Sequence, residues 1–95
     1  PDIIISDVVT STAGRDQGKY FYVIDVDDNY LSLVNGKDRT LEQPKRKKRR
    51  HVQKVLRSET RVAAKILSGD KVLNSELRRD LAFHAGQMQA NNLGG

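Results

Sequence analysis

The chain has 95 residues, and its 17 Lys and Arg residues exceed its 12 Asp and Glu residues to give a net charge of +5. A chain of this length builds one modest core, and the absence of cysteine excludes disulfide bonds and thiolate metal sites. Because no apolar run approaches the roughly 20 residues of a membrane span and no signal-peptide pattern opens the sequence, we expect a cytoplasmic protein.

The positive charge is concentrated in one stretch of the chain. Residues 37–57 contain ten cations and two carboxylates, whereas the balance is −4 over residues 1–36 and +1 over residues 58–95. Such asymmetry predicts one surface that faces a polyanion, rather than charge spread evenly for solubility.

Short runs of β-branched and aromatic residues predict five strands in the first part of the chain. They span residues 7–11 (with residues 3–5 leading in), 20–26, 30–34, 37–41 and 51–56, the last being either a strand or a 3₁₀ turn. Asn35-Gly36 is a strong hairpin signal that should turn the chain into the fourth strand. Pro44 should follow the end of that strand, because proline cannot donate to a ladder. Five short strands predict a small, strongly bent barrel.

A charged loop separates the first two predicted strands. Gly14 and Gly18 lie near its two ends, and glycine tolerates positive φ at little cost. The loop should therefore fold tightly and present Arg15 and Lys19 outward. We expect the Asp16 carboxylate to accept backbone N–H groups within the loop.

Six consecutive cations form the strongest functional signal of the sequence: Lys45, Arg46, Lys47, Lys48, Arg49 and Arg50. Like charges this close repel one another until phosphate neutralises them, with Arg acting as a fork and Lys as a point charge. Together with Lys37 and Arg39, they are expected to bind nucleic acid. The alternatives are a solvated flexible segment, a patch like a nuclear-localisation signal, or nonspecific DNA binding.

Two short helices are predicted in the last third. Ser58 should cap a helix over residues 59–67, and Asn74 or Ser75 should cap a second one over about residues 76–84. Gly86 should end the second helix, with residues 87–95 fraying. Isolated helices this short are marginal in water, so their apolar faces should pack on the barrel, a protein partner being the alternative. These faces contain Val62, Ala63, Ile66, Leu77, Leu81 and Ala85.

The charged loop and the strand after it resemble the signature of KOW domains, small RNA-binding modules of transcription and translation. The matching elements are Gly14-Arg15-Asp16, then Gly18-Lys19, then Val23 and Val26. Many KOW motifs carry a further glycine where this chain has Phe21. The variant without it resembles KOW proteins of archaeal and eukaryotic large ribosomal subunits and their small bacterial relatives, over about residues 8–52.

The resemblance implies a mainly β fold: a five-stranded SH3-like KOW barrel over residues 4–57, with a helical appendage over residues 58–95. It also bears on the register of residues 20–26. Strict alternation would place Tyr20, Tyr22, Ile24 and Val26 on one face. The family pattern instead buries Val23 and Val26, which requires a bulge, and we favour this second register.

The function implied is non-catalytic binding of structured RNA, most specifically ribosomal RNA of the large subunit, by a chain that is monomeric when free. Arg15 and Lys19 would contact RNA, while Gly14, Asp16 and Gly18 would shape the loop. The alternative is a KOW module that binds proteins of transcription elongation or acts as a translation factor.

No catalytic constellation, metal-ligand spacing or cofactor motif is recognisable in the sequence. His51 and His84 stand alone, and the carboxylates of residues 25–28 lack the spacing of a calcium loop. Aromatic residues could stack on unpaired bases, but in a small barrel they more often belong to the core; they are Tyr20, Phe21, Tyr22 and Tyr30.

Overall fold

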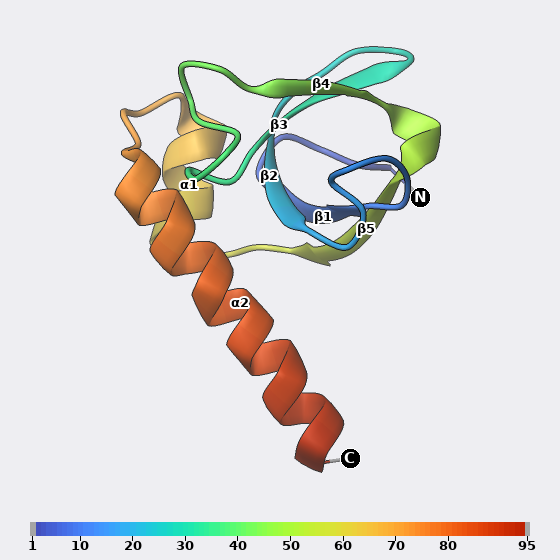
Figure 1. Ribbon diagram of the computed structural model, residues 1–95. Helices are drawn as coiled ribbons and strands as arrows, with labels where there is room; N and C mark the ends of the chain where they lie inside the picture. Colours follow the sequence, from blue (N-terminus) through green and yellow to red (C-terminus); the bar gives the residue numbers. More distant parts are fainter. Residues whose placement is uncertain (1, 95) are drawn as a thin grey trace.

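The computed structural model describes the backbone of residues 2–94 and the side chains of residues 2–89. Five antiparallel strands form one sheet in the order β4-β3-β2-β1-β5, and two helices follow (Figure 1). The elements are β1 (Asp7–Ser11), β2 (Tyr20–Val26), β3 (Tyr30–Val34), β4 (Lys45–Lys48), the 3₁₀ helix η1 (Arg49–His51), β5 (Val52–Arg57), α1 (Arg61–Ser68) and α2 (Asn74–Gly94). No ladder joins β4 to β5 within residues 2–94, so this sheet is open.

The strand β2 lies at the centre of the sheet and is buried on both faces. Phe21 and Val23 point to one side and Tyr22 to the other, and all three are fully buried, as the alternation of side chains along a strand requires. Around Phe21 and Val23 a first core forms from Ile3, Val9, Leu31 and Leu33.

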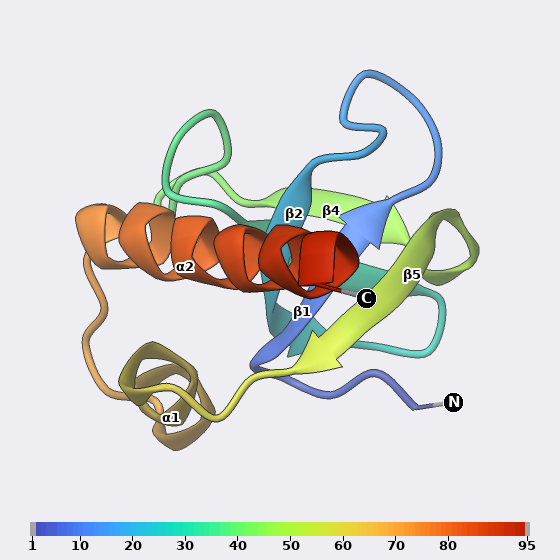
Figure 2. The same cartoon turned by 90° about the horizontal axis from the view of Figure 1, so that it is seen from below.

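The second core joins the sheet to the helices. Tyr22 packs in it with residues of β1, β3 and both helices: Val8, Val34, Val62, Ala63, Leu77 and Leu81. Figure 2 shows α2 lying across the sheet, with α1 beside it. The apolar helix faces thus pack on the sheet, as expected.

No helix of the described chain combines the length and apolar character needed to cross a bilayer.

A bulge interrupts the pairing of β2 with β3. Val23 pairs with Leu33 and Asp25 with Ser32, so Ile24 is the extra residue. Val23 is fully buried, and Val26 is half-buried against the same core. The register with a bulge is therefore confirmed, and strict alternation is not.

The predicted strand over residues 37–41 is wrong. Gly36 has φ 77°, but the Asn35 side chain accepts hydrogen bonds from the backbone N–H of Lys37 and Arg39, each at 3.0 Å. These bonds close a compact loop in place of a ladder. The fourth strand comes later, after Pro44, and consists of the first four residues of the cationic run.

Both predicted helix boundaries change. Thr60 caps α1 through its hydroxyl, which accepts from the Ala63 N–H, whereas the Ser58 hydroxyl bonds to Tyr22 and His84. α2 runs from Asn74 through Gly86 to Gly94, so residues 87–94 are helical; residue 95 lies outside the described residues. One glycine lowers helix stability by only about 1 kcal/mol, which does not end a helix.

Candidate nucleic-acid interface

The cationic run divides its side chains between the two faces of the sheet. β4 pairs with β3 so that Lys47 lies opposite Leu31 and Lys45 opposite Leu33, two buried positions. Arg46 and Lys48 lie on the other face and are exposed. The period-2 geometry of a strand therefore sends alternate cations inward and outward.

Lys47 is a structural residue. Its side chain is only 9% exposed, and its ammonium donates to the Ala13 carbonyl oxygen at 2.7 Å. It lies 3.9 Å from the buried Asp16 carboxylate, which also pairs with Arg39 at 3.4 Å. Asp16 thus binds two cations from other segments, rather than backbone N–H groups of its own loop as expected. These contacts fix the charged loop against β4 and engage the Lys47 ammonium within the protein.

The charged loop has the backbone geometry that its glycines predict. Gly14 has φ 76° and Gly18 has φ 84°. Arg15 is exposed. Lys19 forms an ion pair with Asp38 at 2.7 Å, and this hydrogen bond is the main reason that the pKa of Asp38 falls to about 2.

Arg46 joins β4 to the turn between β2 and β3. Its guanidinium forms an ion pair with Asp27 at 2.8 Å and lies 4.5 Å from the centre of the Tyr30 ring, a cation–π distance. Hydrogen bonds from the Asn29 and Tyr30 N–H groups, together with Arg46, lower the pKa of Asp27. This turn is therefore held against the cationic strand.

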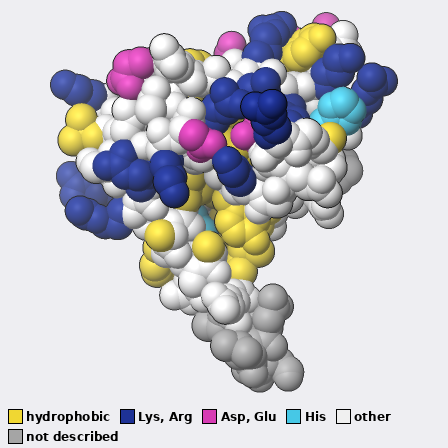
Figure 3. Space-filling model, in the orientation of Figure 1, with side chains coloured by type: hydrophobic (Ala, Val, Ile, Leu, Met, Phe, Trp, Pro, Cys, Tyr) yellow, Lys and Arg dark blue, Asp and Glu magenta, His cyan; other side chains and the backbone are white. Residues whose placement is uncertain are grey.

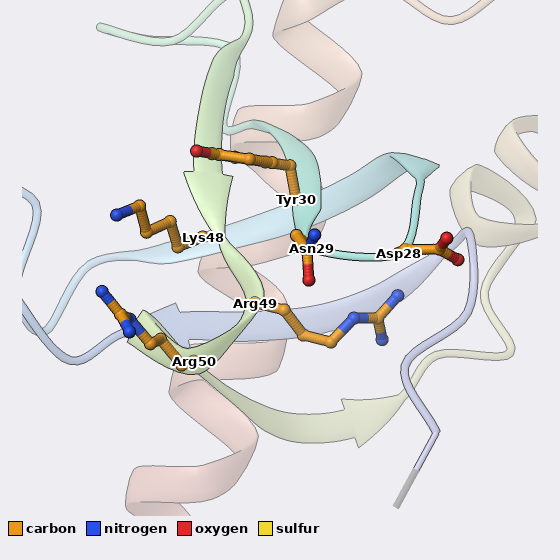
Figure 4. Close-up of a pocket in the computed structure, with 6 residues that line it drawn as sticks. All are labelled: Asp28, Asn29, Tyr30, Lys48, Arg49 and Arg50. Carbon is orange, nitrogen blue, oxygen red and sulfur yellow. The ribbon is translucent and has the colours of Figure 1, made fainter.

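An open groove of about 500 Å³ lies next to this contact, between the turn and the end of β4 (Figure 4). It is lined by Asp28, Asn29, Tyr30, Lys48, Arg49 and Arg50. Arg49 supports the groove, because its side chain donates to the Asp27 carbonyl at 2.9 Å and its N–H donates to the Asn29 carbonyl at 2.8 Å. Lys48 and Arg50 are exposed and form no ion pair with any described residue.

The expected RNA-binding residues thus fall into several groups. Lys48, Arg49 and Arg50 line the groove, and Arg46 lies next to it over the Tyr30 ring. Arg15, Lys19 and Lys37 lie on loops, where all three are exposed. Lys45, Lys47 and Arg39 are partly or fully covered. Figure 3 shows Lys and Arg side chains over the upper part of one face and hydrophobic side chains gathered lower down.

Sequence reasoning missed a buried polar cluster between β2 and the helices. The Tyr22 hydroxyl bonds to Asp80 and lies 2.8 Å from the Ser58 hydroxyl and 3.2 Å from His84 Nε2. His84 Nε2 is 2.9 Å from Ser58 and 3.3 Å from Asp80. The spacing of Asp80 and His84, four residues apart on a helix, was the available signal. The pKa of Tyr22 is raised to about 12, mainly because the phenol is buried and secondly because of its hydrogen bond with Asp80.

This cluster holds α2 to the sheet and lacks the arrangement of a catalytic triad. In a triad the base contacts the nucleophile through one ring nitrogen and the carboxylate through the other; here Ser58 and Asp80 both approach Nε2. Among the described residues, no three His, Cys, Asp or Glu side chains gather where they could hold a metal ion.

Comparison with models of known protein families finds no match for this chain, and comparison with curated proteins finds no similar sequence. Function is therefore inferred from the site itself.

Proposed function

We propose that this chain is a non-catalytic RNA-binding domain whose contact surface is the outer side of β4 and η1. The observation that carries the proposal is the placement of Arg46, Lys48 and Arg50 beside Tyr30 and an open groove. Phosphate contacts from such cations supply most of the affinity of an RNA-binding surface, and an aromatic ring adds a stacking platform.

The positive charge of β4, taken alone, has a simpler explanation than RNA binding, because lysines on an edge strand also prevent that strand from pairing with other chains. β4 is an edge strand of the sheet. Protection of an edge does not require an aromatic ring next to the cations, nor a groove of about 500 Å³. These two features favour RNA binding.

We further propose that the fold is an SH3-like barrel of the KOW type and that its partner is structured RNA of the large ribosomal subunit. Three features support the resemblance. Gly14 and Gly18 both have positive φ in the loop before β2, a bulge follows Val23, and only the three-residue η1 separates β4 from β5, the two ends of the sheet. The loop cations Arg15 and Lys19 would fix orientation on the RNA.

Competition binding tests this function. A labelled RNA hairpin is bound by the full chain and then displaced by unlabelled RNA or DNA hairpins of the same sequence, followed by fluorescence anisotropy. RNA should compete at a clearly lower concentration than DNA, because the 2′-hydroxyls and A-form shape distinguish the two. Absence of binding at moderate salt, or equal competition by DNA, would contradict the proposal.

A protein-binding module is the second candidate. It is favoured by large apolar side chains on the helical part of the molecule: Leu67, Leu73 and Phe83 are 62%, 51% and 53% exposed. Sedimentation of a tagged cell extract through a sucrose gradient separates the two candidates. Migration with large ribosomal subunits that survives moderate salt supports RNA binding, and migration only with polymerase supports this alternative.

A further inference from the structure

We propose that the groove between the β2–β3 turn and η1 binds a single unpaired nucleotide, with the base on Tyr30 and its phosphate on Lys48 and Arg50. This inference rests on the proposed RNA binding and goes beyond it by naming the form of RNA that the site recognises. The groove volume, about 500 Å³, lies within the roughly 300–1,000 Å³ of ligand sites in proteins.

The position of the Tyr30 ring favours stacking. Tyr30 lies directly opposite Lys48 on β4, and Arg46, whose partner is Ser32, lies diagonally to Tyr30. Arg46 covers one ring face at 4.5 Å. Figure 4 shows the ring nearly edge-on, with Lys48 and Arg50 both below it in this view. The ring lines the groove, and a base that enters there meets an aromatic surface already supported from behind.

The cations of the groove have different roles. Arg49 turns away from Lys48 and Arg50 (Figure 4) and donates to the Asp27 carbonyl, which fixes the turn. Lys48 and Arg50 lie together on the Tyr30 side of the groove and form no ion pair among the described residues. The two unpaired cations could therefore bind the phosphate of a nucleotide, while the adjacent aromatic ring stacks on its base.

A paired base cannot occupy this site, because a duplex exposes base edges in its grooves and keeps the faces stacked. Stacking on Tyr30 therefore requires a nucleotide that has left the helix, as in a bulge, a loop or a strand end. The groove consequently distinguishes irregular RNA from a uniform duplex.

Two RNA hairpins test the inference, each with its loop replaced by a polyethylene glycol linker that carries no base: one is fully paired, and the other has a single bulged nucleotide as its only unpaired residue. The full chain should bind the bulged hairpin about tenfold more tightly. A bulge that lacks its base should lose this preference. Tyr30→Ala should bind both hairpins equally, while Tyr30→Phe keeps the preference because the ring remains.

Phe83→Ala is the matched control, since Phe83 is an exposed aromatic residue on α2; this variant should keep the preference. A 2-aminopurine base in the bulge gives a second measurement, as stacking on Tyr30 should quench its fluorescence in the wild-type complex and not in Tyr30→Ala. Equal binding of both hairpins by the wild-type chain would overturn the nucleotide site alone. Failure to bind either hairpin would overturn the proposed function as well.

Discussion

The Lys47 side chain lies on the buried face of the sheet and the Lys48 side chain on the exposed face. Substitutions of these two neighbouring lysines should therefore affect stability and RNA binding separately. Lys47→Met removes the bond to the Ala13 carbonyl and one cation beside the buried Asp16. We expect a loss of about 2–4 kcal/mol of unfolding free energy, with RNA affinity of the folded variant retained.

Lys48→Met should do the opposite, because Lys48 is exposed. Its unfolding free energy should stay within about 0.5 kcal/mol of wild type, while RNA binding weakens. Urea unfolding and fluorescence anisotropy on both variants check the pair. If Lys47→Met leaves stability unchanged, the structural role of Lys47 is wrong.

Tyr22 makes stability depend on pH in the alkaline range. Burial raises its pKa from 10.0 to about 12, so the folded state favours the neutral phenol. The resulting contribution to the unfolding free energy is fully present below pH 10, the pKa of tyrosine in the unfolded chain. It is lost as the pH rises from 10 towards 12.

The melting temperature of wild type should therefore fall more steeply above pH 10 than that of Tyr22→Phe, which has no hydroxyl to ionise. Parallel curves for wild type and Tyr22→Phe would contradict the burial argument.

At the scale of elements, the loop after β3 packs directly on the start of α2. A Cβ at Gly36 would lie 2.2 Å from the Asn74 carbonyl oxygen, whereas Gly18 has no neighbour within 4 Å. Both glycines have positive φ. Gly18→Ala should cost about 1–2 kcal/mol for strain alone, and Gly36→Ala roughly 2–5 kcal/mol because overpacking adds to strain. Denaturant unfolding compares the stability losses of the two variants. Equal losses would show that the contact between Gly36 and α2 rearranges without cost.

Elements that form from their own residues could be predicted from the sequence, whereas elements that depend on contacts between distant segments could not. Strands β1, β2 and β3 follow from their own β-branched and aromatic residues, and their bounds were confirmed. The fourth strand did not follow, because residues 35–41 bind α2 through Leu41 and Asn74, a contact between segments far apart in the chain. β4 contains only cations, and its pairing with β3 is what makes it a strand.

The candidate site was predictable in part for the same reason. Lys48, Arg49 and Arg50 were identified from charge, but Asp28 and Asn29 line the groove only because the β2–β3 turn packs against η1. The inward position of Lys47 required the register with Leu31, which composition does not contain.

At the scale of the whole molecule, RNA binding should depend on where the cations lie and not on net charge. If about five phosphates are neutralised, log K should fall with log salt at a slope of roughly −3.5 to −4.5. Lys48→Gln with Arg50→Gln removes two groove cations and should reduce this slope by roughly 1.4–1.8.

The control pair, Arg61→Gln with Lys71→Gln, removes the same charge from exposed residues at α1 and the loop after it, on the opposite side of the molecule from η1 (Figure 1). The decisive measurement is the salt slope of RNA affinity for the wild type and both double variants, by fluorescence anisotropy. The account predicts a flatter slope and weaker binding for the groove pair, with the control close to wild type. Equal losses in the two double variants would contradict it, since binding would then follow net charge alone.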